Sequence, residues 1–80
     1  DENNIENNIK FYPNPFSDNL YVNSKTESTI TIFNTLGTEV FKTTTGINTF
    51  KFDLSSLNQG AYFIRFNNKE FDRSFVLIKK

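Results

Sequence analysis

Two short stretches carry the side chains that could do chemistry in this sequence. "DLSS" (Asp53 to Ser56) places a carboxylate beside two hydroxyls, and "FSDN" (Phe16 to Asn19) offers oxygen ligands of the kind that bind Ca²⁺. Asp and Ser side chains also bond nearby backbone N–H groups and start turns. The sequence has no His and no Cys, so the commonest general base and the commonest soft metal ligand are missing. We therefore expect turns at both stretches, no catalytic or metal site, no cofactor and no enzyme activity.

Aromatic and basic side chains allow further interpretations. Phe33, Phe41 and Phe63 could be exposed platforms on which sugar rings stack, or they could fill the second face and the ends of a two-sheet core. Lys79 and Lys80 are too few for a membrane anchor. They indicate either a solvated strand end or a chain terminus that a partner protein recognises.

Composition limits the class of protein. Eighty residues suffice for one domain, and ten Phe and three Tyr compensate for the low apolar content of 36%. Nine basic and nine acidic side chains cancel, so the domain has no general attraction for nucleic acid or anionic lipid. No run approaches the roughly 20 apolar residues of a membrane span. The sequence lacks a signal peptide and any Met and opens with Asp, which indicates a C-terminal segment of a longer protein.

The elements that must position these side chains are strands. Apolar residues alternate with period two, and no segment has convincing helical periodicity. Turn signals recur every 8–12 residues or so, as in a sandwich or barrel. We predict an all-β, immunoglobulin-like antiparallel β-sandwich of about seven strands. The expected strands are Ile9–Tyr12, Asn19–Asn23, Ser28–Asn34, Glu39–Thr44, Thr49–Leu54, Ala61–Phe66 and Phe71–Ile78.

The same alternation predicts a core face. The side chains expected to form much of the core are Phe50, Phe52, Leu54, Tyr62, Ile64 and Phe66. Gly37 and Gly60 each close a polar turn before a strand, where we expect a backbone conformation that a Cβ would strain.

Two segments before the first long strand need a separate explanation. The opening "DENNIENNI" is Asn-rich and polar, so we expect residues 1–9 to form a linker and residues 10–80 the domain. Pro13 and Pro15 each fix their own φ and restrict the residue before them, which predicts an extended path over Tyr12–Pro15. Such a rigid segment would set how the linker enters the sandwich and would protect a sheet edge.

Four segments, in order, resemble the C-terminal sorting domain of type IX secretion cargo proteins of Bacteroidetes. They are "YPNPF" with "DNLYV", "ITIFNTLGTEV", "FDLSSLNQGAYFIRF" and "FVLIKK", which together span Tyr12 to Lys80. The family's last strand often carries an early Lys as well as a late one, whereas this chain has Ser74 or Phe75 at the early site and Arg73 upstream. The register of the terminal basic motif is therefore open. Phe33 stands where the family usually has Tyr.

The resemblance implies a set of residues for partner recognition. They are Tyr12, Pro13, Asn14, Pro15, Phe16, Leu36, Gly37, Gly60, Tyr62, Phe75, Val76, Leu77, Ile78, Lys79 and Lys80. The last strand is apolar on both faces until its tip, so we expect one face to meet the core and the other, or the strand's edge, to meet a partner.

The resemblance also implies a route and partners. Such a domain folds in the periplasm and directs an attached upstream passenger through the outer-membrane translocon by contact with a β-barrel shuttle protein. A sortase-like cysteine protease then usually removes it, and the passenger is attached to the cell surface or released. The Asn-rich front of this chain fits an exposed linker where such cutting occurs. The alternative function is a small carbohydrate-binding or adhesion sandwich of a surface protein.

Overall fold

The structure is a computed structural model that describes the backbone of residues 3–5 and the whole of residues 9–80. This part of the chain contains eight strands. The strands are β1 (Asn3–Ile5), β2 (Ile9–Tyr12), β3 (Asn19–Ser24), β4 (Ser28–Phe33), β5 (Glu39–Thr45), β6 (Asn48–Asp53), β7 (Gly60–Asn67) and β8 (Asp72–Lys79). The seven predicted strands correspond to β2–β8, with bounds that differ by one residue or so. No helix, and so none that could cross a membrane, occurs among the residues described.

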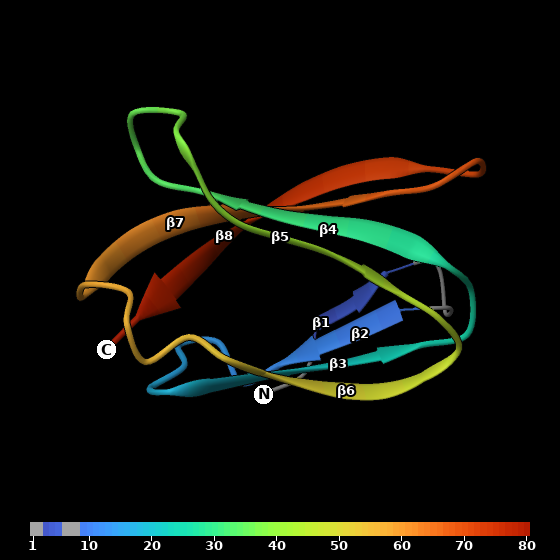
Figure 1. Cartoon of the computed structure of the whole chain (residues 1–80), viewed down its shortest axis with the longest axis horizontal. Coiled ribbons are helices and arrows are strands. Elements are labelled where there is room, and N and C mark those ends of the chain that lie inside the picture. Colours follow the sequence, from blue (N-terminus) through green and yellow to red (C-terminus); the bar gives the residue numbers. More distant parts are fainter. Residues whose placement is uncertain (1–2, 6–8) are drawn as a thin grey trace.

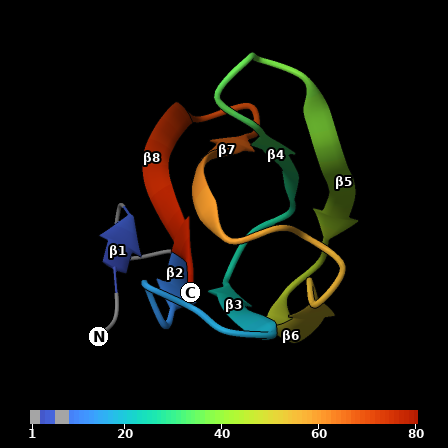
Figure 2. The ribbon, with the colours of Figure 1, turned by 90° about the vertical axis from the view of Figure 1, so that its left-hand side faces the viewer.

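The strands form two antiparallel sheets that face each other (Figure 1). One sheet has the order β1-β2-β3-β6 and the other β5-β4-β7-β8. Seen from the end, β8 and β2 lie at one side of the sandwich, and β5 and β6 at the other (Figure 2). The predicted immunoglobulin-like sandwich is thus confirmed. In an immunoglobulin constant domain the fourth strand joins the first, second and fifth. In this chain, by contrast, the fourth of the seven predicted strands is β5, and it pairs with β4 in the sheet that does not contain β2, β3 and β6.

The core lies between the sheets and is rich in aromatic rings. Its fully buried members are Ile9, Phe11, Phe16, Leu20, Val22, Ile30, Ile32, Ile64, Phe66 and Leu77, joined by Leu54 and Tyr62. Phe11 of β2 contacts both Phe66 of β7 and Phe75 of β8, with ring centroids 5.3 and 5.7 Å apart. At the other side, Phe41 of β5 meets Phe52 of β6 at 5.4 Å. These ring pairs join the two sheets at both sides of the sandwich.

The predicted core face is correct for β7 and only partly so for β6. Tyr62, Ile64 and Phe66 are buried, as is Leu54 just after β6. Phe52 is partly buried against the core, and Phe50 is half-buried and outside the core cluster. The reason is that β6 is an edge strand, so its inner face has a covering neighbour on one side only.

The front of the chain also differs from expectation. Residues 3–5 form β1, which pairs antiparallel with Ile9–Phe11 of β2. Part of the segment expected as a linker over residues 1–9 therefore extends a sheet, and residues 1–2 and 6–8 lie outside the described residues.

Candidate recognition site

Residues 13–16, which we call the proline strap, run beside the C-terminal half of β8. The Asn14 side chain donates from Nδ2 to the Val76 carbonyl at 2.9 Å and accepts at Oδ1 from the Ile78 N–H at 3.0 Å. The Phe16 N–H donates to the Ile78 carbonyl at 2.9 Å, and the Lys80 N–H donates to the Phe16 carbonyl at 2.8 Å. These four hydrogen bonds tie the first family-like segment of the sequence to the last.

The strap continues sheet pairing in a parallel sense. Phe16 forms a parallel bridge with Lys79, because its N–H and C=O bond the residues on either side of Lys79. Two residues earlier, the Asn14 amide repeats this pattern around Leu77. Proline lacks an N–H, so Pro13 and Pro15 cannot donate to a ladder. The Asn14 side chain supplies the donor and acceptor in place of a backbone unit.

The path of the strap corrects the sequence prediction. The chain bends at Asn14 and Pro15, and the peptide bonds before Pro13 and Pro15 are both cis. Because the chain bends at Asn14 and Pro15, the predicted extended path over Tyr12–Pro15 is wrong. The bend lets the side chain of Asn14, rather than its backbone, lie along the edge of β8.

Lys79 is buried, which overturns its interpretation as a solvated strand end. Only 8% of the residue is exposed, its Nζ lies 5.8 Å from the centroid of the Phe16 ring, and Asp18 Oδ1 is 3.8 Å away. Lys80, by contrast, is exposed. The two lysines therefore have different roles: Lys79 fixes β8 to the strap, and Lys80 presents a charge to solvent.

The first residues of β7 lie beside the same end of β8. Gly60 and Tyr62 pair with Lys79 and Leu77 across the β7–β8 ladder. The Tyr62 hydroxyl donates to the Asn58 carbonyl at 2.7 Å, which closes the loop before β7 in the manner of a tyrosine corner. Gly60 has φ of +141°, so the prediction of a strained backbone there is confirmed.

The β4–β5 turn carries the remaining predicted pair. The Asn34 carboxamide oxygen accepts from the N–H groups of Leu36 and Thr38, and Gly37 has φ of +85°, as predicted. Leu36 is 89% exposed at the tip of this turn. The turn contributes an apolar side chain at the surface, and its hydrogen bonds stay within residues 34–38 and do not reach the strap.

The two stretches first considered for chemistry form turns. Asp53 Oδ1 accepts from the Ser55 N–H at 3.0 Å, and hydrogen bonding by Ser55 holds the pKa of the Asp53 carboxyl below its usual value. In "FSDN", the Asp18 carbonyl accepts from the Leu54 N–H at 2.7 Å, and its carboxylate faces Lys79. Among the described residues no three Asp or Glu side chains gather as metal ligands.

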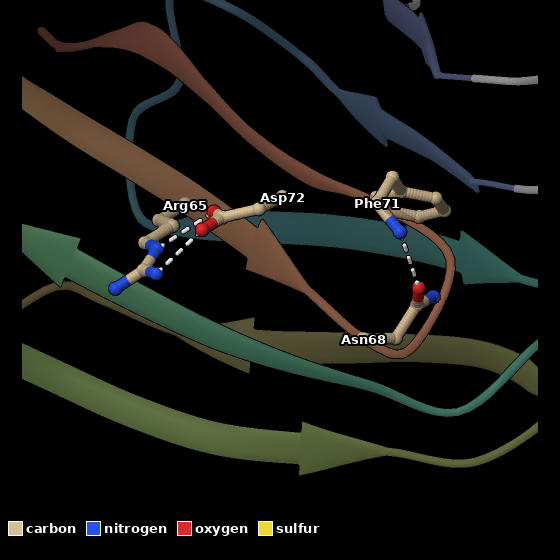
Figure 3. Close-up of polar contacts among 4 residues, drawn as sticks. All are labelled: Arg65, Asn68, Phe71 and Asp72. Atoms are coloured by element: carbon tan, nitrogen blue, oxygen red, sulfur yellow. Dashed lines mark hydrogen bonds and ion pairs between the residues drawn. The ribbon is translucent and has the colours of Figure 1, made fainter.

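An ion pair links the two strands of the β7–β8 hairpin (Figure 3). Arg65 donates from Nε and Nη2 to the two carboxylate oxygens of Asp72, at 2.8 and 2.6 Å. This bidentate contact lowers the pKa of Asp72 and raises that of Arg65. In the adjoining turn, Asn68 Oδ1 accepts from the Phe71 N–H at 3.0 Å.

The aromatic residues considered as sugar platforms do not form one surface. Phe41 packs against the core, whereas Phe33 and Phe63 are cross-strand neighbours on the outer face of their sheet. Phe63 is 43% exposed, and its partner on β8, Val76, is 53% exposed. The outer face thus carries a short apolar row that runs to the edge strand.

Sequence reasoning missed the burial of Lys79 and the role of Asp18. The period-two pattern contained the signal for Lys79, since residues 75, 77 and 79 share one face and the first two of them, Phe75 and Leu77, are apolar. The contact of Asp18 with Lys79 has no sequence signal, because the fold alone brings the segment after the strap close to the end of β8.

Together, the fold and this site define a small β-sandwich domain whose final strand is bound along its edge by the domain's own proline segment. The model of the family of secretion system C-terminal sorting domains matches residues 10–80. The chain therefore belongs to this family, whose members are the sorting signals of type IX secretion. Membership implies interaction with the type IX machinery and a secreted or cell-surface protein. No curated protein gives a significant match to the chain.

Proposed function

We propose that an outer-membrane β-barrel shuttle protein and the translocon recognise this domain at the composite surface formed by the proline strap and the end of β8. The observation that carries the proposal is the set of four hydrogen bonds between the strap and β8. They make one surface from segments more than 60 residues apart in sequence. A partner that reads this surface distinguishes the folded domain from an unfolded chain.

Exposure divides the predicted recognition residues of the strap and β8, with Tyr12, into three groups. Pro15, Val76 and Lys80 are exposed and are available to a partner. Phe16, Leu77 and Lys79 are buried, so they support the surface from below. Tyr12, Pro13, Asn14, Phe75 and Ile78 are partly buried between these groups. Leu36 lies on a separate turn, where it is the most exposed of the large apolar side chains described.

The proposal includes transit through the periplasm and removal of the domain by a sortase-like cysteine protease. The upstream passenger would then reach the cell surface or the medium. Ile9 and Phe11 are fully buried in β2. A cut before Ile9 would therefore leave the core intact, whereas a cut after Phe11 would remove core side chains.

Export of a reporter tests the proposal. The reporter is fused upstream of residues 1–80 in a bacterium with a type IX system, and the exported fraction is measured for wild type and Lys80→Glu. Lys51→Glu, an exposed position on β6, is the matched control. We expect Lys80→Glu to reduce export about fivefold or more, which corresponds to roughly 1 kcal/mol of lost affinity. Equal export of both variants and wild type would remove Lys80 from the recognised surface.

A further inference from the structure

Among the described residues, only the C-terminal half of the β8 edge has hydrogen-bond partners beside it. In β8 the residues at even positions direct their backbone groups away from β7, as the strap bonds to Val76, Ile78 and Lys80 show. The ladder with β7 has no irregularity, so the N–H and C=O of Ser74 and the N–H of Val76 face the same way. No hydrogen-bond partner of these groups is found among the described residues. The strap stops where the open part begins.

An apolar row on the outer face meets this open edge at Val76. Phe33, Phe63 and Val76 are neighbours across β4, β7 and β8. More than two fifths of Phe63 and more than half of Val76 is exposed. The backbone groups of Ser74 and Val76 lie in a row, so a partner must be in an extended conformation to bond them. The apolar side chain of Val76 beside them favours an apolar side chain on that partner.

We propose that residues 72–76 of β8 accept an extended strand of a partner protein by edge-on pairing, with an apolar side chain of that strand beside Val76 and the proline strap fixing where it ends. This inference rests on the proposed function, because the partner is a component of the export machinery. The backbone of one residue of the strap, Phe16, already pairs with β8 in the manner of a neighbouring strand, so this edge can accept backbone hydrogen bonds. The incoming strand continues the row of backbone bonds that the strap leaves unfinished.

The other described long edge strands are protected against such pairing. In β5 the register passes from Ile32↔Phe41 to Phe33↔Glu39, so Val40 is an extra, bulged residue that distorts the edge. The edge strand β6 carries the exposed charges of Lys51 and Asp53. In residues 72–76 of β8 the exposed charges stand at the beginning, on Asp72, which Arg65 pairs, and on Arg73, whereas Ser74, Phe75 and Val76 are uncharged.

The test uses two variants of the same reporter fusion. Ser74→Pro removes the outward N–H and blocks the edge with its ring, while the ladder to β7 keeps its donors. Val76→Asp places a charge where the apolar contact is expected, and Ile47→Asp, at a position 72% exposed in the β5–β6 turn, is its matched control. Thermal unfolding of each purified domain checks folding. We expect Ser74→Pro and Val76→Asp to lower export at least fivefold and Ile47→Asp to leave it unchanged.

Three outcomes would overturn the inference. In the first, the wild-type fusion is exported, and the Val76→Asp variant is folded and is exported equally well. The pairing model then fails and the proposed function stands. If Val76→Asp and Ile47→Asp lower export alike, the loss is unspecific and β8 is not the acceptor. If light scattering shows a wild-type dimer that Ser74→Pro converts into a monomer, the edge pairs with a second copy and not with the export machinery. Failure of the wild-type fusion itself would instead reject the proposed function.

Discussion

The ammonium group of Lys79 lies 5.8 Å from the centroid of the Phe16 ring, and both residues are buried. Asp18 Oδ1 lies 3.8 Å from the same ammonium, at the edge where solvent reaches it. A cation held over an aromatic face and beside a carboxylate avoids the cost of unpaired burial. The penultimate residue of the chain is therefore part of the packed end of the sandwich.

The two terminal lysines should differ in their effect on stability. Lys79→Ala removes the cation–π contact and the buried aliphatic stem, so we expect the free energy of unfolding to fall by about 1–2 kcal/mol. Lys80→Ala alters an exposed side chain and should change it by less than about 0.5 kcal/mol. Urea denaturation of the two variants measures the difference. Equal stabilities would contradict the structural role of Lys79.

The Asn14 amide should hold the strap through both of its hydrogen bonds. Asn14→Ala removes both, and we expect a loss of about 1–2 kcal/mol, since water can reach the freed groups of β8. Asn14→Asp keeps the acceptor for the Ile78 N–H and loses the donor to the Val76 carbonyl, so its stability should be intermediate. Hydrogen exchange of the Ile78 amide gives a local readout, and it should accelerate in Asn14→Ala. An unchanged exchange rate would show that the strap stays in place without Asn14.

The core should depend far more on Phe11 than on Phe50. Phe11 is 1% exposed and contacts Phe66 and Phe75, so Phe11→Ala should cost about 3–5 kcal/mol. Phe50 is half-buried on an edge strand, and Phe50→Ala should cost no more than about 1.5 kcal/mol. Thermal or urea unfolding of both variants decides the point. A larger loss for Phe50→Ala would restore the core predicted from the sequence.

The Arg65–Asp72 pair should make stability depend on acid pH. Arg65 lowers the pKa of Asp72 in the folded state below its ordinary value of 3.8. The contribution is therefore complete above pH 3.8 and disappears as pH falls through the lower folded pKa. Both side chains are nearly half exposed, so the effect is small. The difference in unfolding midpoint between wild type and Asp72→Asn should shrink below pH 3.8. A constant difference across that range would show that the ion pair does not stabilise the fold.

The sequence predicts the strands well because one side of each strand faces a core. The alternation of Tyr62, Ile64 and Phe66 with Phe63 and Arg65 places β7 correctly. Alternation assigns a face, but it does not say whether a strand lies at the centre or the edge of a sheet, which is why Phe50 was assigned to the core.

The site is harder to predict than the fold because its contacts are remote in sequence. The prolines of the strap indicate edge protection, and the structure shows which edge they protect. Nothing local in the sequence pairs Asn14 with Val76 and Ile78, since those contacts follow from the packing of the two sheets. For the same reason the contact between Asp18 and Lys79 could not be anticipated.

The most direct test of the central claim is the dependence of export on the translocon. A reporter fused upstream of residues 1–80 is expressed in a strain with a complete type IX translocon and in one that lacks it, and the fraction of reporter outside the outer membrane is measured. The account predicts export in the first strain and retention of folded reporter in the periplasm of the second. Equal amounts of reporter outside both strains would contradict it.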